Sequence, residues 1–198
     1  RIDLQVRGTP PAQGPVMLVA NHISWLDIPV MHAARFCRFV SKADIKDWPV
    51  IGMMATHAGT LYIARDSRRD ALRVVHHMRD ALQRGAVVAV FPEGTTSDGL
   101  TLLPFHANLI QAAISAHAPV LPVALEFIDS RSGQMSTAPT YIGDQTLIES
   151  VWRTLTTPGL RAVVSYGEPQ SPAGRERREW AAELRESVAA LRTTTGAG

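Results

Sequence analysis

Residues 15–27, PVMLVANHISWLD, change character at their midpoint. Residues 15–20 are apolar without alternation and follow Gly14, which predicts a short strand buried on both faces. The polar pair Asn21 and His22 ends this run, and a helix is expected from Ser24 to about residue 35. A buried strand that passes directly into a helix is the repeating unit of an α/β fold.

The rest of the chain repeats this alternation of apolar strands and amphipathic helices. Val74, Val75 and Met78 belong to an apolar stripe at helical spacing, and Gly85 follows as a helix-ending glycine. Strands are expected at 36–42, 60–65, 86–91, 120–127 and 161–167, and helices at 69–84, 105–117, 145–156 and 174–192. The order predicts an α/β fold with a mixed, mostly parallel central sheet covered by helices on both faces. We expect one domain over residues 1–192 and a disordered tail at 193–198.

The composition narrows the class of protein. The chain has 198 residues and a formal net charge of +2, so no strongly basic face for nucleic acid is expected. Cys37 is the sole cysteine of the sequence, which excludes an internal disulfide. No apolar run reaches the ~20 residues of a spanning helix, and no signal peptide is visible. Because the sequence starts at Arg1, a membrane segment upstream of it is left open.

His22 and Asp27 have two interpretations. In the first, Asp27 satisfies free amides at the start of the helix, as in a capping box that begins at Ser24, and His22 is a hydrogen-bonded residue at a strand end. In the second, Asp27 bends back to Nδ1 of His22 and leaves Nε2 free to take a proton from a substrate hydroxyl. The carboxyl edge of the sheet, where both residues are expected, is where α/β proteins build their sites.

A second polar cluster, FPEGTTSDG, follows the strand expected at 86–91. A tight turn accounts for Pro92 and Gly94. Glu93 is less easily explained as a turn residue, and we expect it to bind substrate, either by accepting hydrogen bonds from a polyol or by positioning the acceptor hydroxyl. Backbone amides around Gly94 and Thr95 are candidates for holding an anion.

Other nucleophile and metal motifs are missing from the sequence. There is no Gly-x-Ser-x-Gly elbow (GTTSDG, residues 94–99, is a near match), no His-Glu-x-x-His and no Cys/His cluster, so no metal site is expected. A histidine base without a nucleophile of its own predicts direct attack by a substrate hydroxyl.

Four sequence blocks together resemble the lysophospholipid acyltransferase family, whose type member is 1-acyl-sn-glycerol-3-phosphate acyltransferase. The blocks are Asn-His-x4-Asp at residues 21–27, a stretch ending in Arg at 59–65, a match at 91–97 to Phe-Pro-Glu-Gly-Thr-Arg-Ser in all positions but residue 96, and an apolar strand around a proline at 120–125. They occur in the family's order over about residues 15–127. The resemblance implies a glycerolipid acyltransferase-like fold and an O-acyltransferase activity.

The resemblance also implies a role for each matched residue. His22 becomes the general base and Asp27 the residue that orients it. The implied substrate-binding residues are Asn21, Arg65, Glu93, Gly94, Thr95 and Lys42. Within that set, Arg65 and Lys42 are assigned to the acceptor's phosphate, and Glu93 and Gly94 to its glycerol. A solvated surface position is an equal alternative for Lys42.

The implied reaction joins an acyl thioester to a lysolipid. The donor is acyl-CoA or acyl carrier protein, a co-substrate, and no cofactor is expected. With 1-acyl-sn-glycerol-3-phosphate as acceptor, acylation of the sn-2 hydroxyl gives phosphatidic acid. One residue departs from the family pattern, because Thr96 stands where the family usually has Arg. A lost cation favours a less anionic acceptor such as lyso-ornithine lipid, and hydrolysis of the acyl thioester is a further alternative.

An enzyme that acts on lysolipids must reach a membrane surface. Residues 47–59, DWPVIGMMATHAG, are apolar with Trp48 at one end, and they form either an interfacial patch or a buried segment. The expected location is the cytoplasmic face of the inner membrane, with the chain peripheral or anchored by a segment upstream of Arg1.

Overall fold

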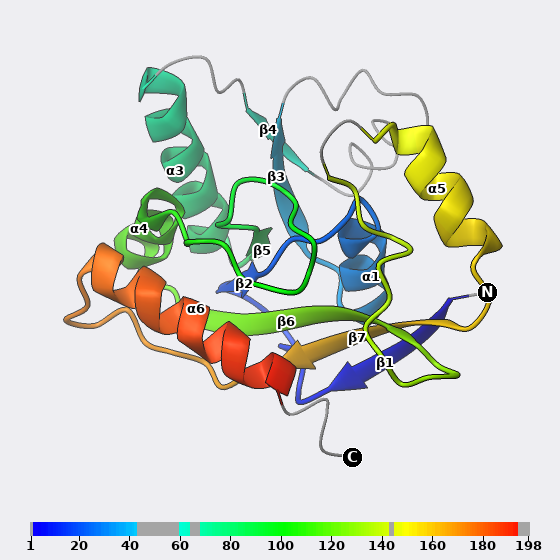
Figure 1. The fold of residues 1–198 in the computed structure, drawn as a ribbon. Coiled ribbons are helices and arrows are strands. Elements are labelled where there is room, and N and C mark those ends of the chain that lie inside the picture. The colour runs from blue at the N-terminus through cyan, green and yellow to red at the C-terminus, as the bar shows by residue number, and fades with distance from the viewer. Residues whose placement is uncertain (1, 43–59, 64–67, 143–144, 194–198) are drawn as a thin grey trace.

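The computed structural model describes residues 2–42, 60–63, 68–142 and 145–193. Figure 1 shows a central sheet with helices on both sides of it. The strands are β1 (Asp3–Arg7), β2 (Val16–Ala20), β3 (Arg38–Lys42), β4 (Leu61–Ile63), β5 (Val87–Val90), β6 (Val120–Asp129) and β7 (Leu160–Tyr166). The helices are α1 (Asp27–Ala34), α3 (Arg68–Gln83), α4 (Ala107–Ala116), α5 (Leu147–Thr156) and α6 (Arg177–Thr193).

The seven strands form one sheet in the order β1-β7-β6-β2-β5-β3-β4. Neighbouring strands are parallel everywhere except between β6 and β7, which run antiparallel. The prediction of a mixed, mostly parallel sheet is confirmed. The strand β2 lies near the centre, between β6 and β5, so its carboxyl end opens onto the middle of one sheet edge.

The two faces of β2 belong to two different parts of the core. Val16, Leu18 and Ala20 pack in the layer that contains α1 residues such as Met31, whereas Met17 and Val19 pack with residues of α3, α4 and α6. All five residues of β2 are buried, which is why the strand is apolar without alternation. Helices therefore cover both faces of the sheet, as the sequence predicts.

Several element boundaries differ from the predicted ones. The first helix begins at Asp27 rather than Ser24, because the amides of Ile23 and Ser24 donate to the Asp27 carboxylate. The edge strand β1 is absent from the sequence-based prediction. Its sequence DLQVR alternates polar and apolar residues, a strand pattern that the prediction did not use, and it pairs in parallel with β7. Helix α6 extends through Thr193, the first residue of the predicted tail, and residues 194–198 lie outside the described part of the chain.

Within the described ranges, every helix is too short or too polar to cross a bilayer. The apolar segment 47–59 lies outside the described residues, so the choice between an interfacial patch and a buried segment stays open.

Candidate active site

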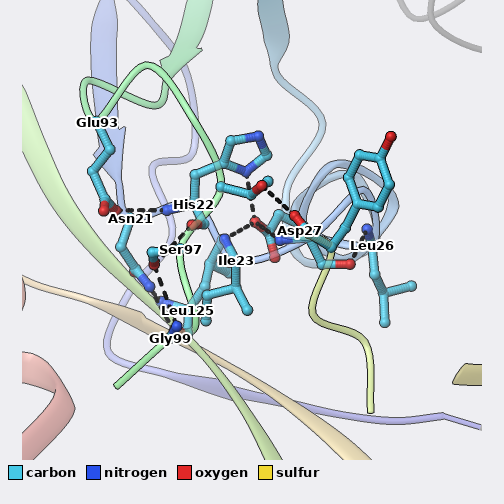
Figure 2. Close-up of polar contacts among 12 residues, drawn as sticks. Asn21, His22, Ile23, Leu26, Asp27, Glu93, Ser97, Gly99 and Leu125 are labelled. Atoms are coloured by element: carbon cyan, nitrogen blue, oxygen red, sulfur yellow. Dashed lines mark hydrogen bonds and ion pairs between the residues drawn. The ribbon is translucent and has the colours of Figure 1, made fainter. Parts of the chain in front are cut away.

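The two predicted polar clusters meet at the carboxyl ends of β2 and β5. These strands are parallel neighbours, so the residues that follow them emerge at the same edge of the sheet. Figure 2 shows His22 and Asp27 beside Glu93 and Ser97, which are about seventy residues away in the chain. The sequence prediction that the two blocks form one site is consistent with this arrangement.

His22 and Asp27 form a hydrogen-bonded pair. Nδ1 of His22 lies 2.8 Å from Oδ2 of Asp27, and the same oxygen accepts the amides of Ile23 at 2.6 Å and Ser24 at 2.9 Å. The Asp27 side chain is fully buried, whereas that of His22 is 20% exposed. A carboxylate can only accept, so Nδ1 carries the proton and Nε2 is the basic nitrogen. No described residue hydrogen-bonds to Nε2.

Asp27 therefore serves both functions that the sequence left as alternatives. Its carboxylate orders the turn before α1 and also orients the histidine. The capping-box alternative is wrong in detail, because the N-cap of α1 is Leu26 and has no side-chain hydrogen bond. Ser24 instead accepts the Leu26 amide through Oγ at 3.2 Å, inside the turn.

The His22 ring is also held from one side by an aromatic ring. Phe91 stacks on it with a centroid separation of 4.2 Å and an interplanar angle of 8°. Phe39 of β3 stacks in turn on Phe91, at 5.4 Å and 19°. Sequence reasoning quoted Phe91 within its block without giving it a role. Its position next to the last residue of a strand that neighbours β2 was the available signal.

Residues of the third sequence block, 91–97, hydrogen-bond to both main-chain groups of His22. The His22 amide donates to Oε1 of Glu93 at 2.9 Å, and the His22 carbonyl accepts from the Ser97 amide at 2.9 Å and the Ser97 hydroxyl at 3.2 Å. The second Glu93 oxygen accepts the Leu103 amide at 2.9 Å. These bonds fix the histidine backbone against the loop that follows β5.

Glu93 is placed differently from its predicted role. It is only 3% exposed, and each carboxylate oxygen already accepts a backbone amide. Burial raises the pKa of Glu93, while the two amide bonds, first that of His22 and then that of Leu103, act to lower it. This geometry makes Glu93 a support for the His22 main chain, and its predicted contact with the acceptor's glycerol stays a prediction.

Asn21 is likewise internal to the fold. Its exposed fraction is zero; Nδ2 donates to the Leu125 carbonyl at 3.0 Å, and Oδ1 accepts the Leu125 amide at 2.7 Å. The side chain thus pairs with β6 as a strand residue would. The implied substrate-binding role of Asn21 is not supported, because no part of the side chain faces solvent.

The turn after Glu93 is exposed. Gly94 has φ of +74°, which a side chain would strain, and an added Cβ would lie 3.1 Å from Cδ2 of His106. Its amide donates to the Phe91 carbonyl at 3.2 Å, so that amide is already engaged rather than free for an anion. Thr95 is exposed to solvent. The Thr96 hydroxyl donates to the Tyr141 carbonyl, so this threonine ties the loop to the segment before α5.

Two arginines of α6 hydrogen-bond to the loop that follows β5. Arg185 donates to the carbonyls of Leu102 and Leu103, at 2.6 and 3.1 Å, and Arg192 donates to the Gly99 and Leu100 carbonyls. The sequence pattern assigned no role to these two arginines. Their contacts depend on tertiary packing and have no local pattern in the sequence.

The structure does not describe the side chains of the two predicted phosphate-binding residues. Arg65 lies outside the described residues, and Lys42 is described only as the last residue of β3. Over the described ranges, no three His, Cys, Asp or Glu side chains gather as a metal site would require.

The described site has the parts of a general base that works on a second molecule. The imidazole is oriented by a buried carboxylate at Nδ1, and no hydrogen bond joins Nε2 to a nucleophilic side chain of the described residues. Such a group can take a proton from a bound hydroxyl.

Comparison with known proteins identifies the family. A family model described as Acyltransferase matches residues 2–126, and 1-acyl-sn-glycerol-3-phosphate acyltransferase of Neisseria gonorrhoeae is 44% identical over 167 residues, which cover 83% of this chain and 64% of that protein. Lyso-ornithine lipid O-acyltransferase of Pseudomonas aeruginosa is 36% identical over 94% of this chain and 70% of its own length. The chain thus spans about two thirds of the length of these relatives.

A solved structure shares the fold. The 1-acyl-sn-glycerophosphate acyltransferase PlsC of Thermotoga maritima superposes with a TM-score of 0.67 at 22% identity, over 96% of this chain and 73% of that one. The sequence resemblance stated from the four blocks is confirmed by the family match, which covers the region of all four. The chain belongs to the acyltransferase family.

Proposed function

We propose that this protein transfers a fatty acyl group from acyl-CoA or acyl carrier protein to the sn-2 hydroxyl of 1-acyl-sn-glycerol-3-phosphate, giving phosphatidic acid. The observation that carries the proposal is the His22–Asp27 pair at 2.8 Å with Nε2 unoccupied by any described residue. The names of the Neisseria relatives, at 44% identity, support this choice of acceptor.

The proposed reaction is a direct transfer. Nε2 of His22 accepts the proton of the acceptor hydroxyl while its oxygen attacks the thioester carbonyl carbon. The buried Asp27 carboxylate stabilises the imidazolium that forms. When the tetrahedral intermediate collapses, the carbon–sulfur bond breaks, and the thiolate takes the proton back from His22. The products are the acylated lipid and a free thiol, and His22 returns to its starting state.

A second acceptor has its own support. Thr96 offers a neutral hydroxyl, already bonded to the Tyr141 carbonyl, where the resembled family usually has a cation. A lyso-ornithine lipid O-acyltransferase is 36% identical over 94% of the chain. We therefore keep lyso-ornithine lipid as the second candidate acceptor. In either case the lipid surface that holds the acceptor is a proposed partner. With 1-acyl-sn-glycerol-3-phosphate as the acceptor, Arg65 and Lys42 are the proposed ligands of its phosphate.

The test is acyl transfer by purified protein with lysophosphatidate and lyso-ornithine lipid as acceptors and acyl-CoA and acyl carrier protein as donors. The product is identified by mass spectrometry, and the His22→Ala variant is the control. Transfer to lysophosphatidate that the variant loses supports the first acceptor. Transfer to lyso-ornithine lipid alone assigns the second, and thiol release independent of any acceptor indicates a thioester hydrolase.

A further inference from the structure

Helix α5 (Leu147–Thr156) is oriented with its apolar side outward. Ile148, Trp152 and Leu155 are 80%, 70% and 67% exposed, whereas Ser150 and Thr154 are each 1% exposed. At 100° per residue the three apolar side chains fall within about 60° of one another, and the two buried polar residues fall on the opposite side. A surface helix of a globular protein has the reverse arrangement. Three large apolar side chains on one exposed face mark an interaction surface.

The outward orientation is fixed by polar contacts on the inner side of α5. Ser150 donates to the carbonyls of Pro139 and Thr140, and the Arg153 guanidinium donates to the Ala138 and Thr140 carbonyls at 2.7 and 2.6 Å. Thr146 closes the helix start with a complete capping box. Rotating the helix to bury its apolar face would break these bonds, so the exposure is a stable property of the fold.

The helix is also tied to the active site. The indole of Trp25, which lies between His22 and Asp27 in the chain, donates to the Ser150 hydroxyl at 3.1 Å. The Tyr141 carbonyl, in the segment before α5, accepts a hydrogen bond from the Thr96 hydroxyl. Figure 1 shows α5, in yellow, at the periphery of the molecule, apart from α3, α4 and α6. A surface that contacts the outer face of α5 is thereby held at a fixed position relative to His22.

We propose that Ile148, Trp152 and Leu155 form a membrane-docking face that inserts into the boundary between the headgroups and acyl chains of a lipid bilayer. The choice of partner rests on the proposed function, because a lysolipid acceptor is held in a bilayer by its own acyl chain. Because Trp25 contacts Ser150 on the inner side of α5, a docked α5 would fix the orientation of the His22 site relative to the bilayer.

Charge and hydrogen bonding on α5 favour a bilayer over a protein partner. Its two charged residues have partners within the protein: the exposed Glu149 carboxylate accepts the Thr146 amide at 2.9 Å, and Arg153 donates to the Ala138 carbonyl at 2.7 Å. Protein interfaces surround an apolar centre with polar groups that bond to the partner. Ile148, Trp152 and Leu155 therefore offer mainly apolar contact, with one tryptophan of the kind enriched at membrane interfaces.

Vesicle binding tests this inference without any turnover. The wild-type chain is floated with phosphatidylcholine–phosphatidylglycerol vesicles beside Leu155→Asn and Trp152→Asn. Leu72→Asn is the matched control, because Leu72 on α3 is 62% exposed and remote from the face. We expect wild type to float and each α5 variant to lose roughly 10- to 100-fold in partition coefficient, with the Leu72 variant within about two-fold of wild type. Quenching of tryptophan fluorescence by brominated lipids, present in wild type and lost in the Trp152 variant, would show directly that Trp152 inserts into the bilayer.

Three results would overturn the docking face. Wild type fails to bind vesicles; Leu155→Asn binds as well as wild type; or Leu72→Asn loses as much as Leu155→Asn. A dimer in sedimentation velocity that Leu155→Asn dissociates would assign the face to a second copy of the chain instead.

The docking face and the proposed function fail separately. If wild type binds vesicles through α5 but acylates no lysolipid, the function falls and the docking face stands. If short-chain lysolipid dispersed in water is acylated while Leu155→Asn binds vesicles as wild type does, the docking face falls and the function stands.

Discussion

Replacing Asp27 by Asn separates the two functions of that carboxylate. The Ile23 and Ser24 amides require an acceptor where Oδ2 now lies, 2.6 and 2.9 Å away. The amide oxygen of Asn must therefore take that place, and its NH2 group must occupy the Oδ1 position, which has no hydrogen-bond partner in the wild type. Nδ1 of His22 then still donates to an oxygen. The substitution removes the negative charge while it preserves the tautomer.

The size of the effect follows from the distance. Two unit charges 2.8 Å apart, at an effective dielectric of about 20, attract by roughly 6 kcal/mol. The dipole of the Asn carbonyl retains part of this stabilisation of the imidazolium, and solvent reaches the 20% exposed His22 ring. We expect a loss of about 3 kcal/mol of transition-state stabilisation, or a fall of roughly a hundred-fold in kcat.

The assay measures initial rates of thiol release and confirms the lipid product by mass spectrometry, with whichever acceptor the wild type uses. Asp98→Asn is the matched control. The Asp98 carboxylate also accepts backbone amides, those of Leu100 and Thr101. It lies in the loop that follows β5 and does not contact His22. We expect its rate to stay within about two-fold of wild type. Urea unfolding of both variants checks that each is folded during the assay.

Two outcomes would refute the reasoning. A fall of less than about three-fold would show that the charge of Asp27 contributes little to the rate-limiting step. A fall near 10⁴-fold in a stably folded variant, the size that a wrong histidine tautomer produces in Ser-His-Asp triads, would show that the two amides do not hold the Asn oxygen in place.

Asn21→Ala leaves both backbone groups of buried Leu125 without partners and should lower the free energy of unfolding in urea by about 3 kcal/mol. Glu93→Gln should lower kcat with little change in acceptor KM, because it loosens the His22 backbone; a raised KM at unchanged kcat would mean that Glu93 contacts the acceptor. Burial raises the pKa of Glu93 from its ordinary value of 4.5, so the ionised form is disfavoured by folding. Wild type should therefore lose stability relative to Glu93→Gln as the pH rises from about 4 through the folded pKa, and urea midpoints across that window measure it. Burial also raises the pKa of Cys37 to about 12, so a thiol reagent should modify native protein at least about a hundred-fold more slowly than the unfolded chain; equal rates would contradict this.

The strand-and-helix pattern was readable from the sequence because most of the sheet is buried on both faces. Residues 16–20 and 87–90 have no polar residue, and the structure buries all of them. The strand β1 was missed although DLQVR alternates polar and apolar residues, because five residues at a sheet edge give only a short local signal and the pairing with β7 spans most of the chain. The start of α1 shifted because a side chain, that of Asp27, competes for amides that a helix would otherwise leave free.

The sequence predicted which residues form the site better than it predicted what each side chain does there. Motif blocks identify His22, Asp27 and Glu93 as neighbours, but a sequence does not show which way a polar side chain points. Asn21 and Glu93 turn inward and bond to backbone groups from distant strands and loops, which needs the tertiary structure. The hydrogen bonds from Ser97 to the His22 carbonyl also join residues far apart in the chain, so the sequence does not show them.

The offset between paired residues of β2 and β5 also separates His22 from Glu93. Val19 lies opposite Val90, and the same offset of 71 residues joins His22 to Glu93. Deleting one residue inside β5 would shift Glu93 away from His22 and turn the core side chains of the strand to the wrong face. Deletions in the exposed turn at 130–133 leave this offset unchanged. Length variation among natural relatives should therefore collect in such turns, while the two strands and the motifs that follow them change in sequence but not in length.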